Sequence, residues 1–240
     1  MPDDSVDDYT YPGNGSLPDD PFIVESSVMA VVNPYYLLQN TVGENALRRL
    51  AGAPVNDWSI SVGGLTSDSY AGFVFWDADL WMQPGLTAAF PVSAQRITNY
   101  RVAKYAQAKA NVKTAYTSSK NRTYFSDDAA LYPWTSGRYG NCTASGPCFD
   151  YEYHLNGDIA ISLVNQWITS GDDRAFRDRY FPIYNSVATA FADLLERNGS
   201  SWTMTNLTDP VCALCAYFVP SSIFIFLGLP FRFFSFINSI

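Results

Sequence analysis

The sequence predicts an all-α fold in which helices of about 12–20 residues are joined by long, aromatic-rich loops. Several stretches space their apolar residues three and four positions apart, as the buried face of a helix requires. The region 117–153 has no such spacing and is long for a connection, which is typical of loops that line a functional pocket. No short internal repeat is evident.

The N-terminal part begins with a predicted loop. Residues 1–22 are acidic and rich in Pro, Gly and Asp, which indicates an extended surface segment. From Ser26 to about Gly52 the pattern is helical, and Pro34 is expected to kink or break that helix. Residues 53–75 combine adjacent glycines with short β-prone pieces and are predicted to form a loop or short strands.

Three helices are predicted in the remainder. The first begins at Pro91, because Pro suits the first turn of a helix, and its Arg, Lys and Gln residues are expected off the apolar face. The second has two apolar sides and is expected to be buried on both. The third runs from about Pro182 to Arg197 and is expected to end at Asn198-Gly199. The apolar positions are, in order, Ile97, Tyr100, Tyr105, Ala108 and Val112; Leu155, Ile159, Leu163 and Trp167, with Ile161, Val164 and Ile168 on the other side; and Ile183, Val187, Phe191 and Leu195.

Composition excludes two broad classes of protein. Hydrophobic residues make up 48% of the chain and aromatic residues 16%, which is enough for a packed core and argues against disorder. The formal net charge is −8, and no cluster of Lys or Arg is present. Such a chain repels a phosphate backbone, so we expect no nucleic-acid partner.

Asn-X-Ser/Thr sequons indicate that the chain passes through the secretory pathway. They lie at Asn14, Asn121, Asn141, Asn198 and Asn206. Cys142 and Cys148 flank a short Gly/Pro loop, and in an oxidising compartment we expect them to form a disulfide, with two free thiols as the alternative. The first residues lack the basic and apolar regions of a signal peptide, so we expect Met1 to be internal to a longer protein.

The last thirty residues, 211–240, differ from the rest, because Arg232 is their only charge. We expect this tail to lie outside the fold, as translated non-coding sequence such as a retained intron or a frameshift. The alternative is a membrane anchor over 211–231, which is uncharged and long enough to span a bilayer. Pro220 and Pro230 interrupt that stretch, so the anchor is the less favoured interpretation.

Residues for several common chemistries are scarce. His154 is the only histidine, and no G-x-S-x-G, H-E-x-x-H or Gly-rich phosphate motif is present. We therefore expect no Ser-His-Asp triad, no metal site and no cofactor. Carboxylates beside aromatic side chains remain, and this combination suits sugars: aromatic faces stack on sugar rings, and carboxylates bind hydroxyls and move protons.

One segment with this combination is 72–81, where Trp76 adjoins Asp77 at a predicted loop-to-helix junction. Asp79 lies two positions further on and would point to nearly the opposite side of a helix. Only one of the two can face a pocket, and we favour Asp77.

A second segment, residues 132–142, places Trp134 and Arg138 in the long loop. The alternative to a binding role for both segments is that Trp76 and Trp134 are core aromatics and that Asp77 is a helix N-cap.

Three segments resemble glycoside hydrolase family 65 and, within it, the fungal acid trehalases. They are residues 59–86, which contain FWDADLW; 132–159, which contain YPWTSGRYG and HLNGD; and 201–210, SWTMTNLTDP. The resemblance covers nearly all of 1–210. It implies an (α/α)6 toroid barrel, here incomplete, and inverting hydrolysis of α,α-trehalose to two glucoses. It also implies an extracellular, periplasmic or vacuolar location, and a longer parent protein with a β-sandwich domain that this chain lacks.

Site residues follow from the same resemblance. Trp76 and Asp77 match the family's FWD motif and are expected to hold the glucose whose bond is cut. Trp134 and Arg138 are expected near the substrate pocket. The H-x-N-x-D stretch that begins an inner barrel helix is matched by His154, Asn156 and Asp158, which we expect to serve mainly structure and the shape of the pocket.

The chain departs from the family after Pro210. There the family continues with an acidic pair whose glutamate is the general acid, whereas Val211-Cys212-Ala213 follows here. Inverting glycosidases need an acid and a base about 6.5–9.5 Å apart. We therefore expect residues 1–210 to be the N-terminal part of the barrel domain, inactive by itself, and 211–240 to be a non-homologous tail. The alternatives are a non-catalytic glucoside-binding remnant, or a hydrolase or phosphorylase of another α-glucoside such as maltose or kojibiose.

Overall fold

A computed structural model describes residues 20–41, 48–49, 59–64, 69–114, 120–143, 146 and 148–207. Several predictions lie outside these residues. They concern the N-terminal loop up to residue 19 with the Asn14 sequon, most of the second half of the first predicted helix, and the tail 211–240.

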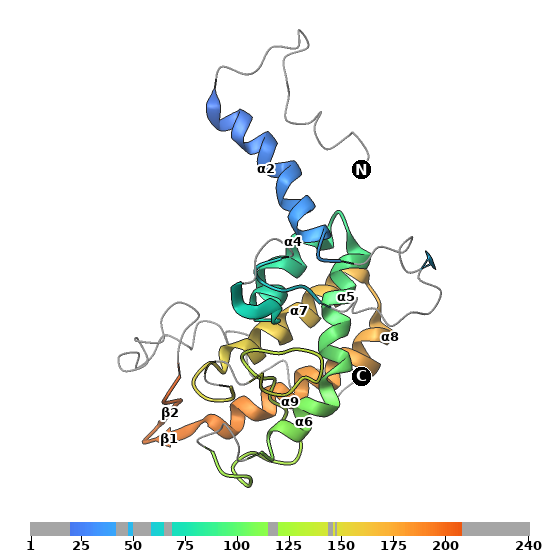
Figure 1. Ribbon diagram of the computed structural model, residues 1–240. Helices are drawn as coiled ribbons and strands as arrows, with labels where there is room; N and C mark the ends of the chain where they lie inside the picture. The colour runs from blue at the N-terminus through green and yellow to red at the C-terminus, as the bar shows by residue number, and fades with distance from the viewer. Residues whose placement is uncertain are drawn as a thin grey trace.

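Among the described residues, the regular secondary structure is helical apart from one short hairpin (Figure 1), which confirms the all-α prediction. The closed (α/α)6 barrel stays a prediction. The helices are α2 (Pro21–Leu38), α4 (Gln83–Thr87), α5 (Pro91–Ala103), α6 (Tyr105–Asn111), α7 (His154–Ser170), α8 (Asp173–Ala175) and α9 (Phe181–Leu194). Shorter turns are η1 (Ser69–Gly72) and the π-helical η2 (Ala78–Met82) and η3 (Phe176–Tyr180), and the strands are β1 (Glu196–Asn198) and β2 (Ser201–Thr203). Within this part of the chain no helix is both long and apolar enough to cross a membrane.

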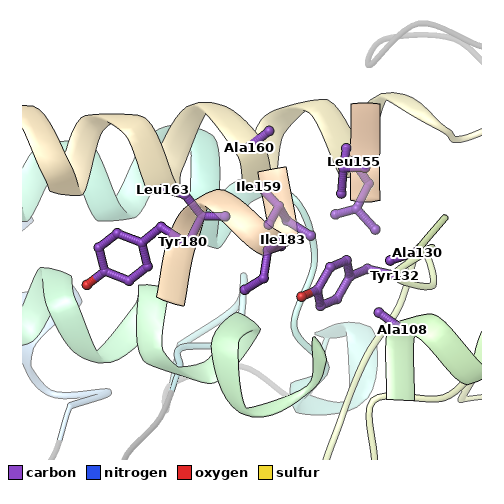
Figure 2. Packing of buried hydrophobic residues seen from close by; sticks show 10 residues of the cluster. Ala108, Ala130, Tyr132, Leu155, Ile159, Ala160, Leu163, Tyr180 and Ile183 are labelled. Carbon is purple, nitrogen blue, oxygen red and sulfur yellow. The ribbon is translucent and has the colours of Figure 1, made fainter. Parts of the chain in front are cut away.

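The core lies where α7 packs against α5 and α9. Figure 2 shows side chains from α7 facing Tyr132, Tyr180 and Ile183. The predicted stripe of α7 is confirmed, because Leu155, Ile159 and Leu163 are almost completely buried. Burial of such side chains contributes about 1.5–3 kcal/mol each, so this contact fixes the position of α7 and of the residues at its N-terminus.

The predicted second apolar face of α7 is wrong. Ile161 is 41% exposed and Ile168 69% exposed. The second buried face is polar instead, with Asp158, Ser162 and Gln166 inside. The amide of Gln166 is stable there because it is paired: the side chain of Gln83 in α4 donates to Gln166 at 3.2 Å and also accepts from Asn165 at 3.0 Å.

The last helix ends earlier than predicted. It begins at Phe181, one residue before the expected Pro182, and stops at Leu194, since Leu195 is extended at φ −74° and ψ 127°. Asn198-Gly199 does not cap the helix. Asn198 ends β1 opposite Ser201, and Gly199-Ser200 is the two-residue turn of an antiparallel hairpin in which Glu196 pairs with Thr203. Gly199 has φ +62°, and Gly is favoured at the first position of a two-residue hairpin turn.

Helix α2 begins five residues before the predicted Ser26. Asp20 caps it by accepting a hydrogen bond from the backbone N–H of Phe22 at 2.9 Å, and Pro21 occupies the first turn. Pro34 does not break the helix, which continues to Leu38. Pro34 lies near the C-terminus, so few helical bonds depend on it, and Gln39 still donates to the carbonyl of Tyr35 at 3.0 Å. Figure 1 shows α2 extending away from the other helices.

Candidate functional site

An isolated bridge joins two of the segments that the sequence singled out. The backbone N–H of Val74 donates to the carbonyl of Ser136 at 2.9 Å, and the N–H of Ser136 donates back at 3.0 Å. The loop containing Trp134 therefore lies beside the segment containing Trp76 and Asp77. After the bridge the chain turns directly into η2, a π-helical turn, a geometry that is frequent at functional sites.

Asp77 and Asp79 have different surroundings. Asp79 is 1% exposed and is paired with Arg101, whereas Asp77 is partly buried. Asp77 does precede η2, but its side chain makes no capping hydrogen bond. Burial raises the pKa of Asp77, and the negative charge of Asp158 adds to that rise, while a backbone hydrogen bond and His154 oppose it. A partly accessible carboxylate of this kind is suited to binding a ligand hydroxyl.

Trp76 lies at the edge of the core. It is partly buried, and it packs against the apolar cluster of α7 and α9. Its ring makes edge contacts with Trp81, at 5.7 Å between centroids, and with His154, at 5.3 Å. Trp81, which sequence reasoning missed, is 61% exposed. The two indoles form an aromatic surface next to Asp77.

His154, the first residue of α7, lies between two carboxylates. Its Nδ1 is 2.8 Å from Oδ2 of Asp158, and its Nε2 is 2.9 Å from Oε2 of Glu152. Burial by itself would lower the pKa of His154, but the hydrogen bonds to Asp158 and Glu152 outweigh it and raise the pKa to about 9. The ring is therefore a cation at neutral pH and donates from both nitrogens. Burial also raises the pKa of Asp158, against the opposing effect of His154.

Trp134 and Arg138 differ in their relation to this site. Trp134 is partly buried, and its ring makes an edge contact with Phe75 at 5.1 Å, one residue from Trp76. Arg138 is exposed, with its guanidinium 5.7 Å from the ring of Tyr139 and its carbonyl accepting from Lys104 at 2.6 Å. The described contacts thus place Trp134 beside the residue that precedes Trp76, and those of Arg138 join it to Tyr139 and Lys104.

A disulfide joins Cys142 and Cys148. The carbonyl of Cys148 accepts from the backbone N–H of Trp134 at 2.8 Å, so the loop is tied to Trp134. Gly146, between the two cysteines, has φ +72°, and a side chain there would overlap the indole of Trp134. Four sequon asparagines are described and are exposed on the surface: Asn121, Asn141, Asn198 and Asn206.

Arg101 is the main residue that the sequence analysis misplaced, since basic residues were expected off the buried face of α5. It is 1% exposed and is bound to Asp79 through both Nε and Nη2, the shortest distance being 2.6 Å. One sequence signal was available: Arg101 lies four residues after Ile97 and four before Tyr105, so it shares their helix face. A buried Arg with a carboxylate partner is then expected, because an unpaired buried charge is costly.

A groove of about 1250 Å³ lies between α2, the segment from Ile60 to Gly64 and the η2–α4 segment. Trp81 is one of its lining residues, but Asp77 and His154 are not. We place the candidate site at Asp77 because the carboxylates, the imidazolium and the aromatic surface converge there. Among the described residues, no group of three or more His, Cys, Asp or Glu side chains is arranged to bind a metal.

The sequence profile of the glycosyl hydrolase family 65 central catalytic domain matches residues 46–210. The chain is 62% identical over 210 residues to the cell wall acid trehalase of Arthroderma benhamiae and 61% identical over 210 residues to the acid trehalase of Emericella nidulans. Each alignment covers 88% of this chain and 20% of the relative. A kojibiose hydrolase of Mucilaginibacter mallensis is 32% identical over 141 residues, which is 57% of this chain and 19% of that protein. The chain thus spans about a fifth of the length of the acid trehalases.

Proposed function

This chain belongs to glycosyl hydrolase family 65, and we propose that it is the part of an acid trehalase that holds one glucose ring of α,α-trehalose at Trp76 and Asp77. The observation that carries this proposal is the position of Asp77. Its carboxylate lacks a capping partner and lies next to an aromatic surface and the cationic His154. Carboxylates accept hydrogen bonds from sugar hydroxyls, and aromatic faces cover the C–H face of the ring.

The names of two relatives support a location for this protein. The name of the Arthroderma benhamiae relative places that protein in the cell wall, and the name of a Saccharomyces cerevisiae relative, which is 41% identical over 181 residues, places it in the periplasm. The exposed sequons and the disulfide support an extracellular or cell-wall location for this protein too.

We propose further that this chain binds the sugar without cleaving it. The family match ends at residue 210, and the next residues, Val211 to Cys215, include no acid. A general acid contributes about 10²–10⁴-fold to such a reaction. Incubation of the purified chain with trehalose should therefore release no glucose. If the purified chain releases glucose and Asp77→Ala does not, this part of the proposal is overturned.

Calorimetry of the full chain with trehalose tests the binding site. A hydrogen bond to a charged group contributes about 1.5–3 kcal/mol, so Asp77→Ala should weaken the affinity about 10- to 100-fold. Asp178→Ala is a matched control, because Asp178 is an exposed acid at the surface of η3. Absence of binding by the folded wild-type chain, or equal affinities of all three proteins, would contradict the assignment.

Kojibiose is the second candidate ligand, because a kojibiose hydrolase is among the relatives. The same titration with kojibiose and with maltose separates the sugars. We expect trehalose to bind most tightly. If kojibiose binds more tightly, kojibiose would be assigned as the ligand in place of trehalose.

A further inference from the structure

We propose that Arg101 is the positioning residue of the sugar site, holding the Phe75–Asp79 turn so that Trp76 and Asp77 keep the orientation in which the ring binds. This inference rests on the function proposed above for Trp76 and Asp77. It adds a residue on α5 that makes no contact with the sugar and acts through the turn.

The guanidinium of Arg101 holds both ends of this turn. Its Nη2 donates to the carbonyl of Phe75 at 3.2 Å and to Oδ2 of Asp79 at 2.6 Å. Its Nε donates to both oxygens of the Asp79 carboxylate, at 3.2 and 3.0 Å. Trp76 and Asp77 lie between the two attachment points. A planar group with several donors can make these contacts together, whereas an ammonium cannot.

The other bonds of the turn do not replace this attachment. The N–H groups of Asp79 and Leu80 donate to the carbonyl of Trp76 at 3.0 and 2.9 Å. Those bonds close the turn on itself but do not fix it to α5. The bridge at Val74 anchors the chain on the N-terminal side only. Among the hydrogen bonds described for this turn, those of Arg101 therefore attach it to α5 on its C-terminal side, where η2 begins.

Arg101 also connects this turn to the two other segments of the site. Its backbone carbonyl accepts from the hydroxyl of Tyr132 at 2.9 Å, and the backbone N–H of Tyr132 donates to the side chain of Asn156 at 2.8 Å. Asn156 lies on α7, two residues from His154. The ring of Tyr132, which Figure 2 shows among the core residues, also lies 5.7 Å from the Arg101 guanidinium. One buried residue thus joins the FWD turn, the long loop and the start of α7.

The test compares Arg101→Lys with Arg179→Lys in the full chain. Arg179 is a matched control, because it also donates to a side chain, Asn99 at 2.7 Å, and lies 5.7 Å from an aromatic ring, but on the surface. Lys at position 101 keeps a positive charge beside Asp79 and loses the contact with Phe75. We expect trehalose affinity to fall about tenfold or more in Arg101→Lys and to stay unchanged in Arg179→Lys.

A second readout needs no ligand and separates failure of this inference from failure of the proposed function. His154 is the only histidine, so its ring-proton NMR signals are assigned directly, and the Trp76 ring 5.3 Å away shifts them. These signals should move in Arg101→Lys and not in Arg179→Lys. If the His154 signals shift in Arg101→Lys but the wild type binds no trehalose, the positioning role of Arg101 is supported and the sugar-binding function is rejected. Unchanged signals and unchanged affinity would overturn the positioning role.

A third variant addresses folding. In the double substitution Arg101→Met with Asp79→Leu, the buried ion pair is replaced by apolar side chains, which is often neutral for stability. The doubly substituted chain should keep a cooperative thermal transition and still bind trehalose about tenfold more weakly. If the folded double variant binds trehalose with wild-type affinity, the Arg101–Asp79 pair has only a structural role, and the inference is overturned.

Discussion

Two clusters of charged residues lie side by side in this protein and differ in their access to water. Asp79 and Arg101 have side chains that are 0% and 1% exposed and meet through several hydrogen bonds. In the other cluster, His154 is 15% exposed and Glu152 12% exposed, and single hydrogen bonds join them. The comparison teaches that the fully buried pair of Asp79 and Arg101, the dry pair, fixes the chain in place. The partly exposed cluster around His154, the wet cluster, can still exchange protons and contact a ligand.

Removing one member of the dry pair should have the largest effect. In Asp79→Ala the guanidinium of Arg101 stays buried without its carboxylate, and breaking a buried pair in this way costs about 3–5 kcal/mol. We expect a loss of that size in the free energy of unfolding, measured by urea titration with circular dichroism. A loss below about 1 kcal/mol, the value typical of an exposed pair, would show that water reaches Arg101 and would end the contrast between the clusters.

The wet cluster should make stability depend on pH. The pKa of His154 is about 9 in the folded chain and near 6.5 when unfolded. Between these two pH values the folded chain binds more protons than the unfolded chain. The stabilisation from protonated His154 is therefore complete below about pH 6.5 and is lost as pH rises through about 9. The raised pKa values of Asp77 and Asp158 act in the same direction at lower pH.

Thermal unfolding at several pH values measures this dependence. The unfolding midpoint should fall between pH 6.5 and 9 in the wild type, and the decrease should be smaller in His154→Gln. An equal decrease in both proteins would place its origin outside this cluster.

A smaller effect is expected from one neighbour of His154. In Glu152→Gln the hydrogen bond at Nε2 loses its negative charge, so the pKa of His154 should fall below about 9. NMR titration of the single histidine measures it directly. Asp178→Asn is the control, since Asp178 is an exposed acid on η3. If the pKa of His154 stays at the wild-type value in Glu152→Gln, Asp158 alone is responsible for raising it.

The smallest effect is expected at a surface pair. Lys113 lies 2.7 Å from Asp127, whose side chain is 94% exposed. Water and salt screen such a pair, so Asp127→Ala should leave the urea midpoint unchanged. A clear loss of stability would show that a short distance matters more than burial, contrary to the comparison above.

Much of the fold could be predicted from local patterns. The apolar spacing of α7 identified Leu155, Ile159 and Leu163 as core residues, and the start of α5 at Pro91 is as predicted. The position of β1 and β2 was missed, because a glycine such as Gly199 serves both at a helix end and at the first position of a hairpin turn. Only the extended backbone at Leu195 separates the two possibilities, and it has no local sequence signal.

The candidate site was only partly predictable. Trp76 and Asp77 could be chosen because an aromatic residue and a carboxylate adjoin in the chain. The partners of His154 lie within four residues of it, yet their convergence depends on where α7 begins. Arg101 and Asp79 lie 22 positions apart, and a contact of that kind depends on the packing of α5 against η2.

The cysteine loop has a practical consequence. Trp134 is held by the backbone of Cys148 and accommodated by the absence of a side chain at Gly146. A host cytosol rich in glutathione keeps thiols reduced, and recombinant material made there would lose the crosslink that closes this loop. Production for ligand-affinity work therefore belongs in a host compartment with disulfide-forming enzymes.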